Sequence, residues 1–111
     1  MVIDGYKALM IILHYGRNHQ LRKMAEESYE LIEAVLNGDQ TEHVAEEIAD
    51  CRVMLEQIKQ LYCIPEETIV KIANQKIDRQ LERMKNEREI QNSRIIDGNM
   101  PGSRLYGNKN V

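Results

Sequence analysis

Two pairs of acidic residues lie on either side of a short break in the sequence around Gly38, and their spacing suits metal chemistry. The pairs are Glu27 with Glu30 and Glu47 with Asp50. If the flanking segments are helices folded back about the break, Glu27 faces Asp50 and Glu30 faces Glu47 at matching heights. Four neighbouring carboxylates repel one another unless a cation lies between them, and oxygen ligands suit Mg²⁺, with Mn²⁺ as a substitute. The pattern therefore predicts a metal-dependent enzyme that acts on phosphates.

Helical phase separates Glu27 from its neighbour Glu26. At about 100° per residue, Gln20, Lys23, Glu27 and Glu30 follow one line along the flank of the apolar stripe. Glu26 points further outward, toward solvent. We therefore expect Glu27 to face the neighbouring helix, whereas Glu26 serves at most as an outer ligand or base.

Glu47 falls inside the apolar arc of its own helix, and Asp50 follows one turn later at the edge of that arc. A lone carboxylate on a core face is costly, which implies a cationic partner. The alternative interpretation is that the acids are ordinary surface charges that pair along their helices with Lys23, Arg52 or Lys59. That alternative requires both the matched spacing and the inward phase to be accidental.

Apolar periodicity and capping residues predict the elements that position these acids. We expect four helices, at about residues 5–15, 18–37, 41–62 and 65–91. Their end signals are N-caps at Asn18 and Thr41, a glycine after the second helix at Gly38, and Pro65 in a first turn. The sequence thus predicts an all-α domain over residues 1–93, followed by a loop or mobile tail over 94–111.

The predicted fourth helix carries a basic stripe beside its apolar face. Lys76, Arg79 and Arg83 share one flank there. Arg suits bidentate contact with phosphate oxygens, and Lys supplies a compact positive charge, so we expect these residues to bind substrate together with Gln20 and Lys23. The alternative is a set of pairs within the helix, with the acids Asp78, Glu82 and Glu87 as partners.

Composition limits the classes of partner. The chain has 111 residues, no Phe and no Trp, so we expect a small helical core that a homo-oligomer completes. A formal net charge of −3 gives no reason to expect a nucleic acid or an anionic membrane as partner. Cys51 and Cys63 lack metal-ligand or disulfide spacing, which predicts reduced thiols in a cytoplasmic protein.

The acidic motifs resemble those of the MazG-like all-α nucleoside triphosphate pyrophosphohydrolases, whose pattern is EExxE, a short break and ExxD. Here the pattern reads Glu26-Glu27-x-x-Glu30 and Glu47-x-x-Asp50, with Gln20 upstream. The resemblance covers roughly residues 17 to 85, and within them it includes Lys23. It implies a MazG-like four-helix bundle that works as a dimer or tetramer.

The resemblance also implies roles for individual residues. Glu27, Glu30, Glu47 and Asp50 match the Mg²⁺ ligands of the family, and Lys76 with Arg79 matches its phosphate contacts. Members of the family cleave nucleoside triphosphates between the α and β phosphates, giving a monophosphate and pyrophosphate. Related branches prefer dUTP or phosphoribosyl-ATP.

Our hypothesis is that the four carboxylates hold one or two Mg²⁺ ions, that Glu27 or Glu30 is the base, and that Lys76 and Arg79 stabilise the leaving pyrophosphate. A second hypothesis is a non-catalytic helical module that binds nucleotide or metal, or only oligomerises. A di-iron bundle is not predicted because Glu-x-x-His pairs are missing. Nothing in the sequence selects a base, although the tyrosines that could stack on one are Tyr6, Tyr15, Tyr29 and Tyr62.

Overall fold

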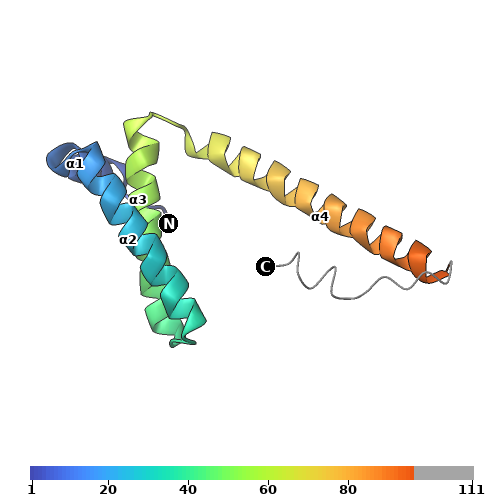
Figure 1. The fold of residues 1–111 in the computed structure, drawn as a ribbon. Coiled ribbons are helices and arrows are strands. Elements are labelled where there is room, and N and C mark those ends of the chain that lie inside the picture. Colours follow the sequence, from blue (N-terminus) through green and yellow to red (C-terminus); the bar gives the residue numbers. More distant parts are fainter. Residues whose placement is uncertain (97–111) are drawn as a thin grey trace. The chain divides into compact units, whose positions relative to one another are not determined.

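The computed structural model describes the backbone of residues 1–96 and the side chains through Arg94. These residues form four α-helices and no strand, which confirms the predicted all-α class (Figure 1). The helices are α1 (Gly5–Tyr15), α2 (Arg17–Leu36), α3 (Thr41–Leu61) and α4 (Glu66–Ile96). Residues 94–96 belong to α4, so the prediction that a tail begins at residue 94 was wrong. The predicted loop over 97–111 otherwise lies outside the described residues.

Residues Met1–Thr68 form one compact unit, and the second unit begins at Ile69 within α4. In the first unit α3 packs against both α1 and α2. Helix α2 descends to the break around Gly38, and α3 returns beside it (Figure 1). This helical hairpin is the arrangement that the acidic pairs require, and each unit is described by itself below.

Two polar or flexible residues set the bounds of α1. The Asp4 side chain accepts a hydrogen bond from the Lys7 backbone N–H over 3.1 Å and so caps the first turn. Gly16, with a φ of 89°, ends α1 through its N–H to the Ile12 carbonyl and also starts α2. The predicted cap at Asn18 was therefore wrong, because a glycine at this corner lets α2 begin at Arg17.

The break between α2 and α3 is a two-bond C-cap. Gly38 has a φ of 70°, its N–H bonds the Val35 carbonyl, and the Asp39 N–H bonds the Ala34 carbonyl. The prediction that Gly38 follows the end of α2 is confirmed. Helix α3 begins at Thr41 with Gln40 as its N-cap, one residue before the predicted cap, and no side chain caps it.

Helix α3 ends in the same way, but with Cys63 in place of glycine, at a φ of 54°. Just beyond, Lys59 lies 3.0 Å from Glu66 and 3.1 Å from Glu56, which ties the end of α3 to the start of α4. The Glu66 and then the Glu56 hydrogen bonds raise the pKa of Lys59. Helix α4 begins at Glu66, so Pro65 precedes its first turn instead of opening it.

These two helix ends give opposite expectations for stability. Gly38→Ala places a Cβ at a positive φ and should destabilise the fold by about 1 kcal/mol. Cys63→Gly removes the same strain and should stabilise it by a similar amount, about 1 kcal/mol. Urea unfolding followed by circular dichroism measures both. A Cys63→Gly variant less stable than the Cys63→Ala control would contradict the strain argument.

The apolar core of the described residues is small. Its buried members are Ala8, Ile12, Ala34 and Met54. Large apolar side chains are exposed on the same helices, including Leu36 and Leu55. Much apolar surface of the first unit is thus exposed, as the sequence led us to expect of such a short chain.

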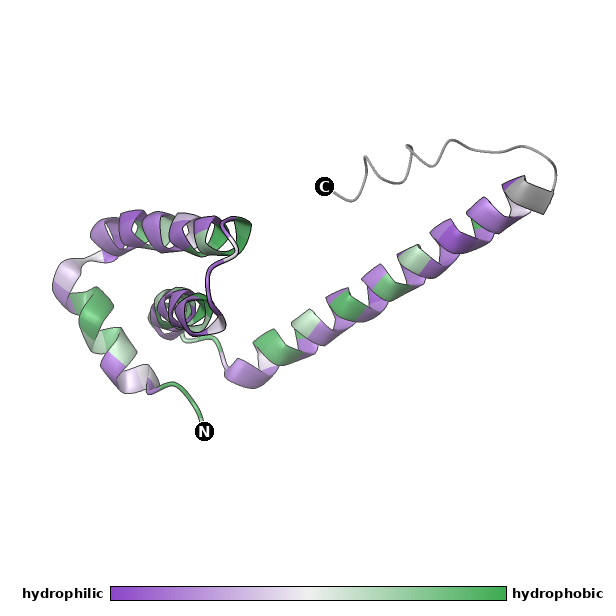
Figure 2. Ribbon diagram, turned by 90° about the horizontal axis from the view of Figure 1, so that it is seen from below, coloured by the Kyte–Doolittle hydropathy of each residue, from purple (hydrophilic) through white to green (hydrophobic). Residues whose placement is uncertain are grey.

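Helix α4 is exposed along nearly its whole described length. Apolar segments recur along it between polar ones (Figure 2), with Ile72, Ile77 and Met84 among the exposed side chains. Such recurrence is typical of a helix with one apolar face. Within residues 1–96, no helix is both long enough and apolar enough to cross a membrane.

Candidate metal site

Three of the four predicted acids come together between α2 and α3. One carboxylate oxygen each from Glu27, Glu30 and Glu47 lies within 4.8 Å of the other two. Glu27 and Glu47 are 9% and 8% exposed, whereas Glu30 opens to solvent. The predicted inward phase of Glu27 and Glu47 is therefore confirmed, and their oxygens are close enough together to share one ion.

Each of the two buried carboxylates has one paired and one unpaired oxygen. Glu27 Oε1 lies 3.4 Å from Lys23 Nζ, and Glu47 Oε1 lies 3.6 Å from a ring nitrogen of His43. Glu27 Oε2 and Glu47 Oε2 are buried without any hydrogen-bond partner. Buried acceptors without partners are rare in folded proteins and need a reason. A cation held between the helices would satisfy both oxygens.

Some pairing along the helices, which was the alternative interpretation, is also present. Lys23 pairs with Glu27 at the i,i+4 spacing. His43, one turn before Glu47, contacts both Glu47 and Asp39. These pairs occupy only the outer oxygen of each buried acid, so they do not explain the inner ones.

Asp50 is the one predicted ligand outside the close group of oxygens. It is exposed, and it lines a cavity of about 550 Å³ together with Glu26 and Glu27. Glu26 is exposed, as expected. The structure thus places Asp50 outside the close group of oxygens, on the wall of a cavity that Glu27 also lines.

This cavity lies between α1, α2 and α3 and has a mixed lining. Ile11 from α1 and Val53 and Met54 from α3 provide apolar surface. The predicted substrate-binding residues Gln20 and Lys23 also line it. Its volume, about 550 Å³, falls in the usual range for small-molecule sites, and it adjoins the acidic group through Glu27.

A chain of hydrogen bonds runs along the cavity and was not predicted. Gln20 Nε2 donates to Gln57 Oε1 over 2.9 Å, and Gln20 Oε1 lies 2.7 Å from His19 Nδ1. Gln20 and Gln57 are 6% and 1% exposed. The signal for Gln57 was in the sequence, because the inward line from Glu47 continues through Cys51 and Met54 to Gln57 at steps of four, three and three residues.

Among the tyrosines considered as base-stacking residues, Tyr15 alone lines the cavity. Its ring stacks on the His19 imidazole with centroids 5.1 Å apart and planes 17° apart. Tyr6, Tyr29 and Tyr62 are exposed elsewhere on the described surface. The structure therefore selects one aromatic pair, on α1 and α2, as the flat surface of the cavity.

The basic stripe of α4 belongs to the second compact unit. Lys76, Arg79 and Arg83 are exposed, and within the described residues no ion pair involves them. The alternative of pairing within the helix is therefore not seen. Their contact with phosphate stays a prediction.

Cys51 lies one turn after Glu47 on α3, close to the acidic group. Its thiol donates to the Glu27 carbonyl over 3.4 Å. Burial raises the pKa of Cys51, and the negative charges of Glu27, Asp50 and Glu47 add to that rise against a hydrogen bond with Ser28.

We therefore expect Cys51 to react slowly with iodoacetamide at neutral pH, because only the thiolate is nucleophilic. Cys63 is exposed and should be alkylated several-fold faster. Peptide mass spectrometry over a time course measures both rates in one sample. Equal rates would contradict the effect of burial and of the neighbouring carboxylates.

The chain was compared with known protein families, with curated proteins and with solved structures, and none of the three comparisons gave a match. Fold and site geometry therefore rest on the described residues themselves, and activity is a matter for proposal.

Proposed function

We propose that this chain is a Mg²⁺-dependent nucleoside triphosphate pyrophosphohydrolase of the MazG-like kind, which releases a nucleoside monophosphate and pyrophosphate. The observation that carries the proposal is the pair of buried oxygens without partners, Glu27 Oε2 and Glu47 Oε2, beside Glu30. A purely structural pair of carboxylates would be expected to find donors. Carboxylate oxygens without nitrogen or sulfur ligands favour Mg²⁺ or Mn²⁺ over zinc.

Three glutamates would hold the ion, namely Glu27, Glu30 and Glu47, with Asp50 close by on the cavity wall. When bound, Mg²⁺ supplies charge neutralisation for the triphosphate and lowers the pKa of a coordinated water. Glu30 is the better placed of the two α2 glutamates to accept a proton from the attacking water, because it opens to solvent and can pass the proton on.

Positive side chains would then contact the phosphates. Lys23 lines the cavity and already lies beside Glu27, where it can exchange a carboxylate for a phosphate oxygen. Lys76, Arg79 and Arg83 are exposed on α4, and we assign them to the leaving pyrophosphate as part of the proposal.

We also propose that the active form is a homodimer or homotetramer. The support is the small set of buried apolar residues against the many exposed ones, such as Ile32, Leu36 and Leu55 on the hairpin. A second copy that covers them would supply the missing burial.

The test is pyrophosphate release from a panel of canonical and modified nucleoside triphosphates, with Mg²⁺ and with EDTA. We expect Mg²⁺-dependent release from at least one triphosphate, with monophosphate as the second product. Absence of turnover across the whole panel would overturn the proposal. Tight calorimetric binding of Mg²⁺ or nucleotide without product would instead favour a non-catalytic binding module on this scaffold.

A further inference from the structure

The hydrogen bonds along the cavity have a fixed direction. Gln57 donates its Nε2 to the Met54 sulfur over 3.6 Å, which leaves its Oε1 to accept from Gln20. The Gln20 amide nitrogen is the donor in that bond, so the Gln20 Oε1 atom is the one that faces His19 Nδ1, over 2.7 Å. Two buried amides thus hold an acceptor against the imidazole.

An acceptor at Nδ1 determines the tautomer of His19. Since an amide oxygen cannot donate, Nδ1 must carry the hydrogen, and in the neutral ring Nε2 then holds a lone pair. The stacking of Tyr15 on the same ring restricts its rotation. In the neutral ring His19 therefore has its hydrogen-bond acceptor at Nε2, and His19 is one of the residues that line the cavity.

We infer that this cavity takes the base of the nucleotide, and that His19 Nε2 accepts a hydrogen bond from an exocyclic amino group of that base. The inference rests on the proposed function, because the acidic group at Glu27 would place the triphosphate at one end of the same cavity. The other walls suit a planar heterocycle: Tyr15 offers a flat ring, and Ile11 and Val53 offer apolar surface.

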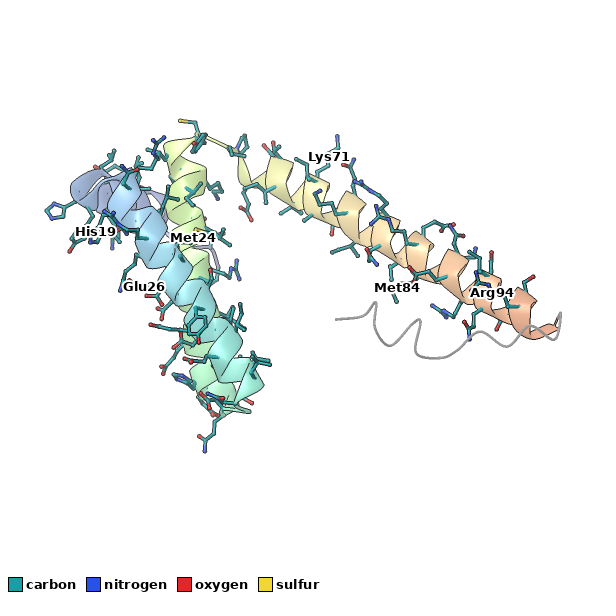
Figure 3. The ribbon with its side chains drawn as sticks, in the orientation of Figure 1. His19, Met24, Glu26, Lys71, Met84 and Arg94 are labelled. Atoms are coloured by element: carbon teal, nitrogen blue, oxygen red, sulfur yellow. The ribbon has the colours of Figure 1, made fainter. Side chains whose placement is uncertain are left out.

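The acceptor at His19 Nε2 favours an amino group over a carbonyl. Glu26 and Glu27 line the same cavity, and Figure 3 shows Glu26 on the same flank of α2 as His19. Lys23 lines the cavity too, but it is paired with Glu27 over 3.4 Å. At His19 Nε2 itself a base carbonyl would meet an acceptor, whereas an amino group can donate to it. Uracil and thymine, whose ring N–H lies between two carbonyls, fit this wall poorly. Adenine and cytosine fit it well.

The first test reads the tautomer in the free protein and needs no activity. Long-range ¹H–¹⁵N NMR at about pH 8.5, where an ordinary imidazole is neutral, should show His19 with its hydrogen on Nδ1. Gln57→Leu, which releases Gln20, should shift the ring toward the Nε2–H form. A wild-type ring with its hydrogen on Nε2 would overturn the inference.

The second test measures base preference by calorimetry, with Mg²⁺ and α,β-methylene triphosphates that cannot be cleaved at that bond. The ligands are the deoxyadenosine and deoxycytidine forms and their counterparts with hydrogen in place of the amino group. We expect the amino forms to bind about tenfold more tightly. His19→Phe, which keeps an aromatic ring beside Tyr15 but removes the acceptor, should erase that ratio. Tyr6→Phe, an exposed position on α1 outside the cavity lining, should preserve it.

The outcomes separate this inference from the proposed function. Equal affinity for the amino form and its counterpart without the amino group, or no binding of either, overturns the inference about the base. This holds even if pyrophosphate is released from some triphosphate. The protein could instead prefer the amino forms tenfold, in a manner that depends on His19, and release no pyrophosphate. That result supports the inference about the base and overturns only the assigned reaction.

Discussion

Glu47→Gln should lower Mg²⁺-dependent pyrophosphate release by at least about a hundredfold, because it removes charge from the most buried ligand of the acidic group. Glutamine keeps the size of the side chain but supplies one neutral oxygen in place of two that share a negative charge. Steady-state assays across Mg²⁺ concentrations measure the loss. Glu46→Gln is the matched control, since Glu46 is the preceding residue, is exposed and lies outside the close group.

The same substitution should stabilise the metal-free protein. Glu47 Oε2 is buried without a partner near two other carboxylates, and the glutamine amide can donate to them. We expect a gain of about 1 kcal/mol in EDTA, with loss of the stabilisation that Mg²⁺ gives the wild type. Thermal unfolding with and without Mg²⁺ measures both. Full activity in Glu47→Gln, or an equal Mg²⁺ effect on both proteins, would contradict the assigned ligand.

Ile12→Ala should destabilise the protein by about 3 kcal/mol, the largest effect on stability that we expect from a single apolar truncation. Ile12 is 2% exposed and is the largest apolar side chain that is fully buried in the described residues. Because so few apolar residues are buried, the surrounding side chains cannot fill the space that the removed Ile12 atoms leave.

Urea unfolding measures the loss, with Leu13→Ala as the control. Leu13 is 65% exposed, so its truncation should cost less than about 0.5 kcal/mol in the monomer. A cost at Leu13 equal to that at Ile12 would show that Leu13 is buried in the protein in solution and would contradict this assignment of the core.

Local patterns predicted the helices and the orientation of the key acids, because both depend on residues near in sequence. The 3.6-residue phase alone distinguished Glu27 from Glu26 and turned Glu47 inward. The errors at Asn18 and Thr41 were errors of boundary, where a backbone-only start at Gly16 or Gln40 replaced a side-chain cap.

The cavity could not be predicted in the same way. Its polar line joins His19 and Gln20 on α2 to Gln57 on α3, and only the packing of the two helices brings them together. Asp50 shows the same limit from the other side. Matching heights on the two helices predicted Asp50 beside the other acids, but its side chain lies outside their close group. Membership of that group depends on side-chain conformation, which residue spacing does not give.

The short break at Gly38 also bears on the order of folding. Glu27 and Glu47 belong to helices joined by a tight turn, so the loop closed by bringing them together is short, whereas α1 must dock on α3 from further along the sequence. Contacts of small sequence separation form early in folding. We therefore expect a cation at this hairpin to accelerate folding more than it slows unfolding, which stopped-flow refolding with and without Mg²⁺ can measure. Ion binding would then act as a nucleation event, before the cavity against α1 exists.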